Sequence, residues 1–107
     1  MSSRRVTVIV VADSELAFLP LGDSSVVATA VERARAATCS PEMLVWVNPS
    51  CVTAYEGLRP SQRPRCDVSF VPSLAQLASN CSADVVLVHD AQRPLTLPAT
   101  FDRVADA

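Results

Sequence analysis

The hydrophobic residues of the chain form short runs that alternate with amphipathic segments. Four apolar runs rich in β-branched residues predict strands at 6–12, 43–47, 68–71 and 84–89. Helical periodicity predicts helices at 25–37 and 73–81, a short helix at 50–56, and a last helix that begins near Pro98. Asp23 or Ser24 is expected to cap the helix at 25–37.

The alternation of strands and helices predicts an α/β fold with a mostly parallel sheet of about four strands. The run Val6–Ala12 is continuously apolar, which is typical of a parallel strand that is covered on both faces. Ligands of such sheets bind beyond the carboxyl ends of the strands. The candidate positions are therefore 12–13, 71–73 and 89–90.

Composition excludes several classes of protein. The length of 107 residues corresponds to one domain, and the net charge of −2 excludes a strongly basic nucleic-acid binder. The apolar run at 6–12 is far shorter than the roughly 20 residues that span a bilayer. All nine basic residues are arginine, which excludes lysine Schiff-base chemistry and a P-loop lysine. We therefore expect no nucleic-acid partner and no membrane association.

Neither the N-terminal sequence nor the cysteines indicate export. Arg4 and Arg5 precede an apolar run, but Asp13 and Glu15 follow it directly, so a buried strand explains the run better than a signal peptide. We expect a cytoplasmic protein. The cysteines at 39, 51, 66 and 81 contain no Cys-x-x-Cys pair, which argues against a zinc site, and we interpret them as reduced.

The segment from Ala83 to Leu95 carries the most chemical information. A predicted strand brings His89 and Asp90 to its carboxyl end, and Arg93 follows in a turn. Asp90 can hold a divalent cation and Arg93 can bind a phosphate through two hydrogen bonds. Alternatively, Asp90 caps the turn and forms an ion pair with Arg93. His89 has two interpretations, as a general base or as a side chain hydrogen-bonded to the backbone.

This segment closely resembles the V-L-V-H-D-A-A-R-P-L motif of the 2-C-methyl-D-erythritol 4-phosphate cytidylyltransferases, enzymes of non-mevalonate isoprenoid biosynthesis. The segment 18–22, followed by 26–31, is similar to the F-x-P-L-G motif and first helix of that family. Residues 43–49 are similar to its second strand and the proline after it. The resemblance extends over nearly the whole chain but covers only the N-terminal half of a family enzyme.

The resemblance implies a Rossmann-like, three-layer, nucleotidyltransferase-type fold that binds CTP with Mg²⁺, the one cofactor implied. It places Asp90, Ala91 and Arg93 on the side of the sugar-phosphate substrate, with Asp90 also at the metal. It places Ala12, Asp13 and Ser73 on the nucleotide side.

The loop after the first strand departs from the family pattern. The family has a glycine-rich loop there with an arginine and a lysine, whereas this chain has Asp13 to Ala17, with neither glycine nor cation. Each carboxylate at about 4 Å repels an anion by roughly 1 kcal/mol in water and about 4 kcal/mol in a shielded site. Each lost contact to the transition state costs about 2.7–4 kcal/mol more. A rate loss beyond about ten-thousandfold is expected.

These observations predict a single, truncated nucleotidyltransferase-like domain over residues 1–107, inactive on its own. Three functional hypotheses remain open. The first is a vestigial or regulatory member with residual binding of a nucleotide or sugar phosphate through Asp90 and Arg93. The second is a non-catalytic interaction or dimerisation module, because a short sheet exposes an edge that association covers. The third is an enzyme completed in trans by another chain. The second and third hypotheses together lead us to expect a homo-oligomer or a completing protein partner.

Overall fold

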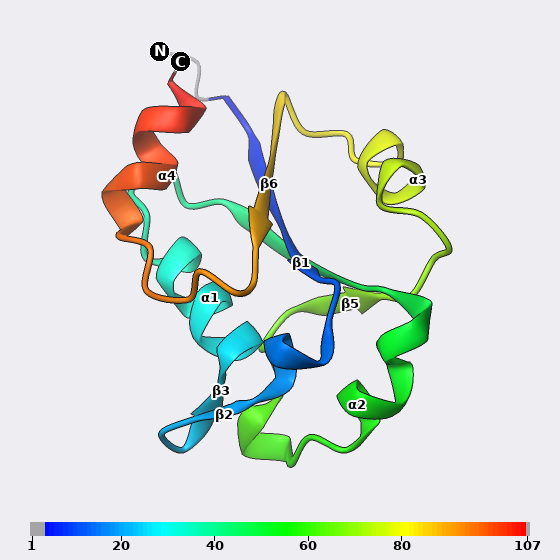
Figure 1. Cartoon of the computed structure of the whole chain (residues 1–107). Helices are drawn as coiled ribbons and strands as arrows, with labels where there is room; N and C mark the ends of the chain where they lie inside the picture. Colours follow the sequence, from blue (N-terminus) through cyan, green and yellow to red (C-terminus); the bar gives the residue numbers. More distant parts are fainter. Residues whose placement is uncertain (1–3, 107) are drawn as a thin grey trace.

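The chain folds around a four-stranded parallel sheet with the strand order β5-β4-β1-β6 (Figure 1). The structure is a computed structural model that describes residues 4–106. The strands are β1 (Val6–Ala12), β4 (Glu42–Val47), β5 (Asp67–Ser69) and β6 (Val85–Asp90). The predicted α/β, Rossmann-like fold with a parallel sheet of four strands is confirmed.

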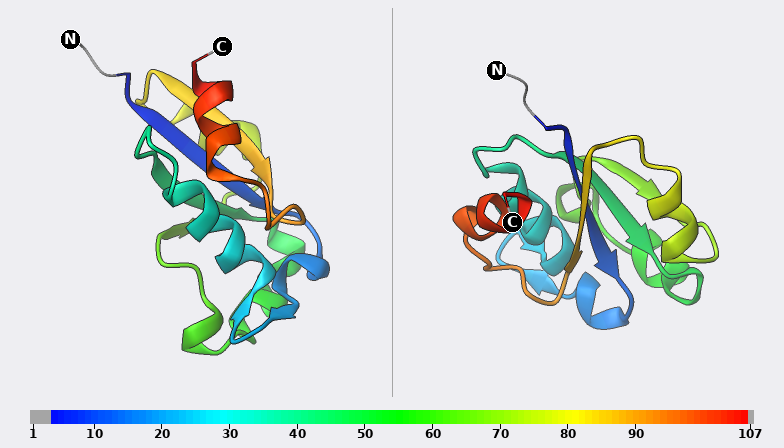
Figure 2. Two further views of the ribbon diagram at one scale, coloured as in Figure 1. Left: turned by 90° about the vertical axis from the view of Figure 1, so that its left-hand side faces the viewer. Right: turned by 90° about the horizontal axis from the view of Figure 1, so that it is seen from above.

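Helices lie on both faces of the sheet, which gives three layers (Figure 2). One face carries α1 (Val26–Arg35) and α4 (Pro98–Ala105), and the other carries α3 (Leu74–Ser79). The short helix α2 (Val52–Glu56) follows β4. Three 3₁₀ turns complete the fold: η1 (Glu15–Phe18), η2 (Pro49–Cys51) and η3 (Pro60–Gln62). Within residues 4–106 no helix has the length and hydrophobicity needed to cross a membrane.

Strand β1 is buried on both faces, as its unbroken apolar sequence predicts. The side chains of residues 6, 8, 10 and 12 belong to the main core beneath α1 and α4. Ile9 points to the opposite face and is also completely buried. Trp46 of β4 covers this second face, and its indole N–H donates a hydrogen bond of 2.9 Å to the carbonyl oxygen of Val71. Trp46 is therefore a packing residue of the sheet.

The predicted cap of α1 is wrong by one or two residues. Ser25 is the cap, because its Oγ accepts a hydrogen bond from the N–H of Ala28. Asp23 and Ser24 are instead part of a hairpin between β2 (Pro20–Leu21) and β3 (Ser24–Ser25) that hydrophobic patterning does not indicate. Its two-residue turn begins with Gly22 at φ 61°, a left-handed conformation that glycine adopts without strain.

Several elements are also shorter than predicted. Helix α1 ends at Arg35 rather than at residue 37, α3 covers 74–79 rather than 73–81, and β5 covers 67–69 rather than 68–71. The end of α1 has a tertiary cause. The N–H groups of Thr38 and Cys39, which lie just beyond it, are bound by a side chain of α4.

That side chain is Asp102, whose carboxylate attaches α4 to the connection between α1 and β4. Asp102 Oδ2 accepts a hydrogen bond of 3.0 Å from the N–H of Thr38, and Oδ1 accepts one of 2.8 Å from the N–H of Cys39. Desolvation opposes the charge of Asp102, but these two backbone hydrogen bonds outweigh it and hold the pKa of the carboxyl below its usual value.

Because the pKa of Asp102 is lower in the folded than in the unfolded chain, its contribution to stability is complete above the unfolded pKa of about 3.9 and is lost as the pH falls through the folded pKa. We therefore expect Asp102→Asn to lower the free energy of unfolding at neutral pH, and the difference from the wild type to shrink on acidification. Urea titrations between about pH 6 and pH 3 measure this difference. Asp106→Asn, at the end of the same helix, is the control, and an equal loss in both variants would contradict the prediction.

Candidate functional site

The strand order changes direction at β1, and this defines where a ligand can bind. From β1 the chain adds β4 and then β5 on one side, and it returns across the sheet to place β6 on the other side of β1. The first crossing uses α1 and the return uses α3, on opposite faces (Figure 2). The loops that follow β1 and β6 leave neighbouring strands at this point, and open α/β sheets bind ligands in the crevice at such a switch point.

A hollow of about 430 Å³ lies at this switch point. This volume is within the range of ligand-binding pockets, about 300–1,000 Å³. The hollow has an apolar floor and a polar rim that contains two carboxylates and no cationic side chain. Its lining consists of Val11, Leu74 and Val88 on the floor, and Asp13, Ser14, Asp90 and Gln92 on the rim.

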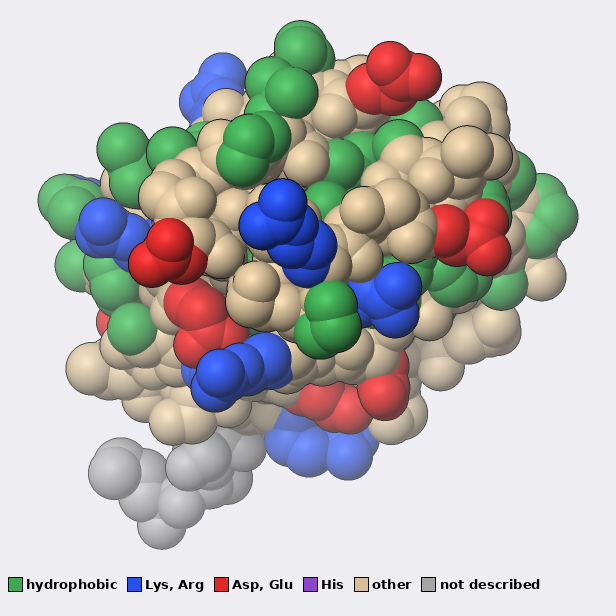
Figure 3. Space-filling view, turned by 90° about the horizontal axis from the view of Figure 1, so that it is seen from below, with side chains coloured by type: hydrophobic (Ala, Val, Ile, Leu, Met, Phe, Trp, Pro, Cys, Tyr) green, Lys and Arg blue, Asp and Glu red, His purple; other side chains and the backbone are tan. Residues whose placement is uncertain are grey.

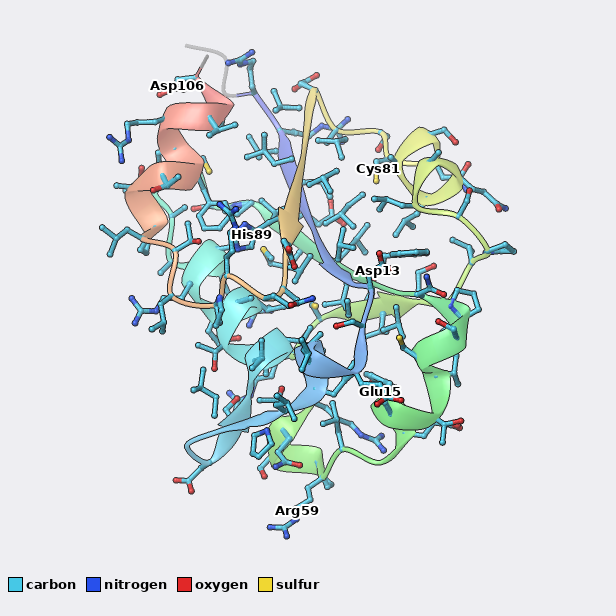
Figure 4. The ribbon with its side chains drawn as sticks, viewed as in Figure 1. Asp13, Glu15, Arg59, Cys81, His89 and Asp106 are labelled. Atoms are coloured by element: carbon cyan, nitrogen blue, oxygen red, sulfur yellow. The ribbon has the colours of Figure 1, made fainter. Side chains whose placement is uncertain are left out.

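Asp13 directly follows β1 (Figure 4). It is held by Asn48, which directly follows β4. Asn48 Nδ2 donates a hydrogen bond of 2.7 Å to Asp13 Oδ1. The orientation of the amide is fixed, because Asn48 Oδ1 accepts a hydrogen bond of 3.0 Å from the N–H of Ser50. The backbone N–H of Asn48 also donates to the carbonyl oxygen of Ala12. Two neighbouring strand ends thus position one carboxylate.

Asp90, at the end of β6, is held by the turn that it begins. Its Oδ1 accepts a hydrogen bond of 2.9 Å from the N–H of Gln92. The side chain of Gln92 then reaches the loop after β1, where its Nε2 donates a hydrogen bond of 3.1 Å to Ser14 Oγ. Sequence analysis overlooked Ser14 and Gln92. Their positions in the sequence could have indicated them, because Ser14 directly follows Asp13 and Gln92 lies two positions after Asp90.

The turn after β6 decides between the interpretations of His89. His89 Nε2 lies 3.1 Å from the carbonyl oxygen of Arg93, and the imidazole packs edge-on against Phe101 with ring centroids 4.9 Å apart (Figure 4). This geometry supports the interpretation of His89 as a side chain that is hydrogen-bonded to the backbone. The expectation that Asp90 caps the turn is correct, whereas its ion pair with Arg93 is not found among the described residues.

The remaining predicted residues lie around the hollow rather than in its lining. Ala12 and Ala91 are completely buried in the main core, because their side chains point to the α1 face of the sheet. Ser73 caps α3 through a hydrogen bond of 3.1 Å from the N–H of Gln76 to its Oγ. Arg93 is exposed in the turn after β6.

The arginines of the loop 58–65 do not contribute to the hollow. Arg59 extends away from the body of the protein (Figure 4), and Arg63 stacks on the ring of Tyr55 at 5.7 Å. The end of the molecule toward which the strands run carries acidic and basic side chains interspersed, rather than one basic patch (Figure 3). Most of this loop is exposed to solvent, although Leu58 is buried.

The cysteines are unpaired, and two of them are held as thiols by their surroundings. All four are free, and burial raises the pKa of the Cys66 thiol to about 11, with Arg35 opposing the rise. Burial, followed by the hydrogen bond and charge of Asp102, also raises the pKa of Cys39. Across residues 4–106 no group of three or more His, Cys, Asp or Glu side chains could hold a metal ion. The two carboxylates of the hollow can therefore supply only part of a coordination shell.

Asn48 both caps η2 and positions Asp13, so its removal should be measurable in stability. We expect Asn48→Ala to lower the free energy of unfolding by about 0.5–2 kcal/mol, the usual cost of a lost cap. Chemical denaturation measures the change. Asn80→Ala is the matched control, because the Asn80 side chain has no hydrogen bond within the described chain, and its effect should stay below about 0.5 kcal/mol. Equal losses of stability in the two variants would contradict the stabilising role of the Asn48 side chain.

The fold, but not the sequence, is similar to known proteins. No family model matches the chain, and no similar protein is found among curated sequences. A crystal structure of Rv0371c from Mycobacterium tuberculosis H37Rv matches with a TM-score of 0.72 and 18% identity, over 99% of this chain and 61% of that one. A structure of Rv0371c in complex with manganese matches with a TM-score of 0.69 and 16% identity, over 98% of this chain and 60% of that one. The chain thus spans about three fifths of the proteins that it matches, and at this identity the similarity shows a shared fold.

Proposed function

We propose that this chain is a Rossmann-like domain that binds a nucleotide or a sugar phosphate as its complex with a divalent cation, and that it does not catalyse nucleotidyl transfer by itself. One observation carries the proposal. Asp13 and Asp90 lie on the rim of the same hollow at the switch point of the sheet. Carboxylate oxygens are hard ligands of the kind that Mg²⁺ and Mn²⁺ bind.

The ligand set favours a cation that arrives together with a phosphate. Each aspartate uses Oδ1 in a hydrogen bond to its own surroundings, through Asn48 or Gln92, so each is held in place while Oδ2 is not engaged by the described residues. Mg²⁺ sites commonly combine one or two carboxylates with water and substrate phosphates. The manganese complex of Rv0371c supports a divalent cation in this fold.

The charge of the hollow makes the cation necessary for an anionic ligand. Its lining includes two carboxylates and no arginine. Each carboxylate at about 4 Å would oppose a free phosphate by roughly 1 kcal/mol in water and about 4 kcal/mol in a shielded site. A divalent cation between the carboxylates and the phosphate reverses the sign of this interaction. The resemblance of 83–95 to cytidylyltransferases makes CTP the first nucleotide to test.

We expect CTP to bind saturably with Mn²⁺ or Mg²⁺ and not with EDTA, as measured by calorimetric titration. Asp13→Ala and Asp90→Ala should each weaken binding by about tenfold or more. Asp106→Ala, at the far end of α4 from Asp13 (Figure 4), should leave the affinity unchanged. NMR line broadening by Mn²⁺ should centre on the residues that follow β1 and β6. Absence of heat from folded protein at about 1 mM CTP and metal, a concentration that detects even weak binding, would refute the proposal.

We also expect no pyrophosphate release when the chain is given CTP, Mg²⁺ and 2-C-methyl-D-erythritol 4-phosphate. The loop Asp13–Ala17 has no glycine and no cation to neutralise a triphosphate during transfer, so the rate should be lower than that of an active cytidylyltransferase by more than about ten-thousandfold. An active family enzyme in the same assay is the control. Turnover by the chain alone would contradict this prediction without affecting the prediction of binding.

A further inference from the structure

A second hollow, of about 180 Å³, lies between the sheet and α3, near the amino ends of the strands. Thr7, Glu42 and Leu44 line it from the sheet. Leu77 of α3 and Cys81, just after that helix, line it from the other side (Figure 4). Thr7 and Glu42 are register partners in neighbouring parallel strands, so their side chains lie on the same face of the sheet. We call this space the α3 hollow.

Thr7 brings an unused hydroxyl group to the α3 hollow. It is the one residue of β1 with a polar side chain, and only 3% of it is exposed. Every side-chain N or O atom of residues 4–106 that is fully shielded from solvent has a hydrogen-bond partner. The Thr7 hydroxyl has no partner among these residues, so it must open into the hollow that Thr7 lines. Because burying a hydroxyl without a partner costs free energy, this group is suited to bind a ligand.

Other polar side chains of the α3 hollow are also not engaged by the described residues. The carboxylate of Glu42 forms neither an ion pair nor a hydrogen bond within residues 4–106. The side chains of Asn80 and Ser82 form no hydrogen bond there either. Cys81 differs, because its thiol donates to the carbonyl oxygen of Leu77. The hollow therefore offers carboxylate, hydroxyl and amide oxygens, which all accept hydrogen bonds.

The charge of the α3 hollow favours a cationic ligand. Glu42 is the one charged residue of its lining. Arg5 lies beside the hollow, where its guanidinium donates a hydrogen bond to the carbonyl oxygen of Ser82. The carboxylate of Asp84 accepts a hydrogen bond of 2.8 Å from the backbone N–H of Arg5, so an acid lies close to this base and offsets its charge. A cation that enters the hollow meets a carboxylate and no cationic side chain of the lining.

The lining fits an organic ammonium ion better than a metal ion. Within residues 4–106 no group of three or more His, Cys, Asp or Glu side chains could hold a metal ion. An ammonium group carries three N–H donors, which match the oxygens of Glu42 and Thr7. Leu44 and Leu77 offer apolar surface to an alkyl chain. A cavity of about 150 Å³ holds benzene, so the α3 hollow has room for a ligand of about six non-hydrogen atoms.

We propose that the α3 hollow binds a short aliphatic amine. The ammonium group donates hydrogen bonds to the Glu42 carboxylate and the Thr7 hydroxyl, and the alkyl chain lies against Leu44 and Leu77. No residue lines both the α3 hollow and the hollow with Asp13 and Asp90, so this inference is independent of the nucleotide or sugar phosphate proposed above.

The first test compares a diamine with an uncharged molecule of the same length. In NMR titrations, 1,4-diaminobutane should shift the amide signals of Thr7, Leu44 and Cys81 saturably, with a dissociation constant of about 1 mM or lower. 1,4-Butanediol should bind at least about tenfold more weakly, because a hydroxyl group forms no charge-assisted hydrogen bond to the carboxylate of Glu42 as an ammonium does.

The second test uses two variants of the lining. Glu42→Gln and Thr7→Val should each weaken the binding of 1,4-diaminobutane by about tenfold. Glu56→Gln is the matched control, because it removes the same charge from α2, which follows the opposite end of β4, and it should leave the affinity unchanged. Circular dichroism confirms that each variant folds.

The stability of Thr7→Val separates a binding role from a structural one. Without ligand, this substitution should not lower the free energy of unfolding in urea, because it removes a hydroxyl that has no partner in the described chain. A hydroxyl needed by the fold would instead make the variant less stable, and that result would contradict its assignment to a ligand.

Three binding results would overturn the proposal. Absence of saturable shifts at about 20 mM 1,4-diaminobutane would show that the α3 hollow does not bind amines. Equal affinities for the diamine and the diol would show that charge is not recognised. Unchanged affinity in both Glu42→Gln and Thr7→Val would show that the diamine binds elsewhere on the protein.

Discussion

The burial of β1 on both faces is the constraint on which the rest of the structure depends. Residues 6–12 lie between β4 and β6, with one set of side chains in the main core and Ile9 buried on the opposite face. A strand in this position needs a neighbour on each side and cover above and below. The helices α1, α3 and α4 supply the cover, and the two neighbours require the chain to reverse direction at β1.

This strand order also positions the candidate site. The hollow with Asp13 and Asp90 forms at the carboxyl ends of the neighbouring strands β1 and β6, where Gln92 joins the loops that follow them. At the side of the sheet the strand order leaves β6 as the outermost strand, next to α4. Two side chains at the carboxyl end of β6, Val88 and Asp90, line this hollow.

The two carboxylates of the site are held in place by hydrogen bonds from neutral groups rather than by ion pairs. Asn48 holds Asp13, and Gln92 connects Asp90 to the loop after β1. This network fixes two carboxylates without neutralising them, so the hollow retains its negative charge. A cation is the simplest partner for such a site. Its lining contains no arginine, so it offers no cationic side chain to a transferring phosphoryl group.

The sequence predicted the four strands of the parallel sheet, the α/β class and the positions of Asp13 and Asp90 at strand ends, because an apolar run of β-branched residues carries its own secondary-structure signal. It did not determine that α1 is capped by Ser25 and ends at Arg35, since a hairpin and a carboxylate 64 residues away in the chain, Asp102 against Thr38, fix these limits. The Asn48–Asp13 bond and the Gln92–Ser14 bond were likewise decided by tertiary structure alone. Such contacts depend on which strand ends become neighbours, and strand order is a property of the folded sheet that no local pattern of residues records.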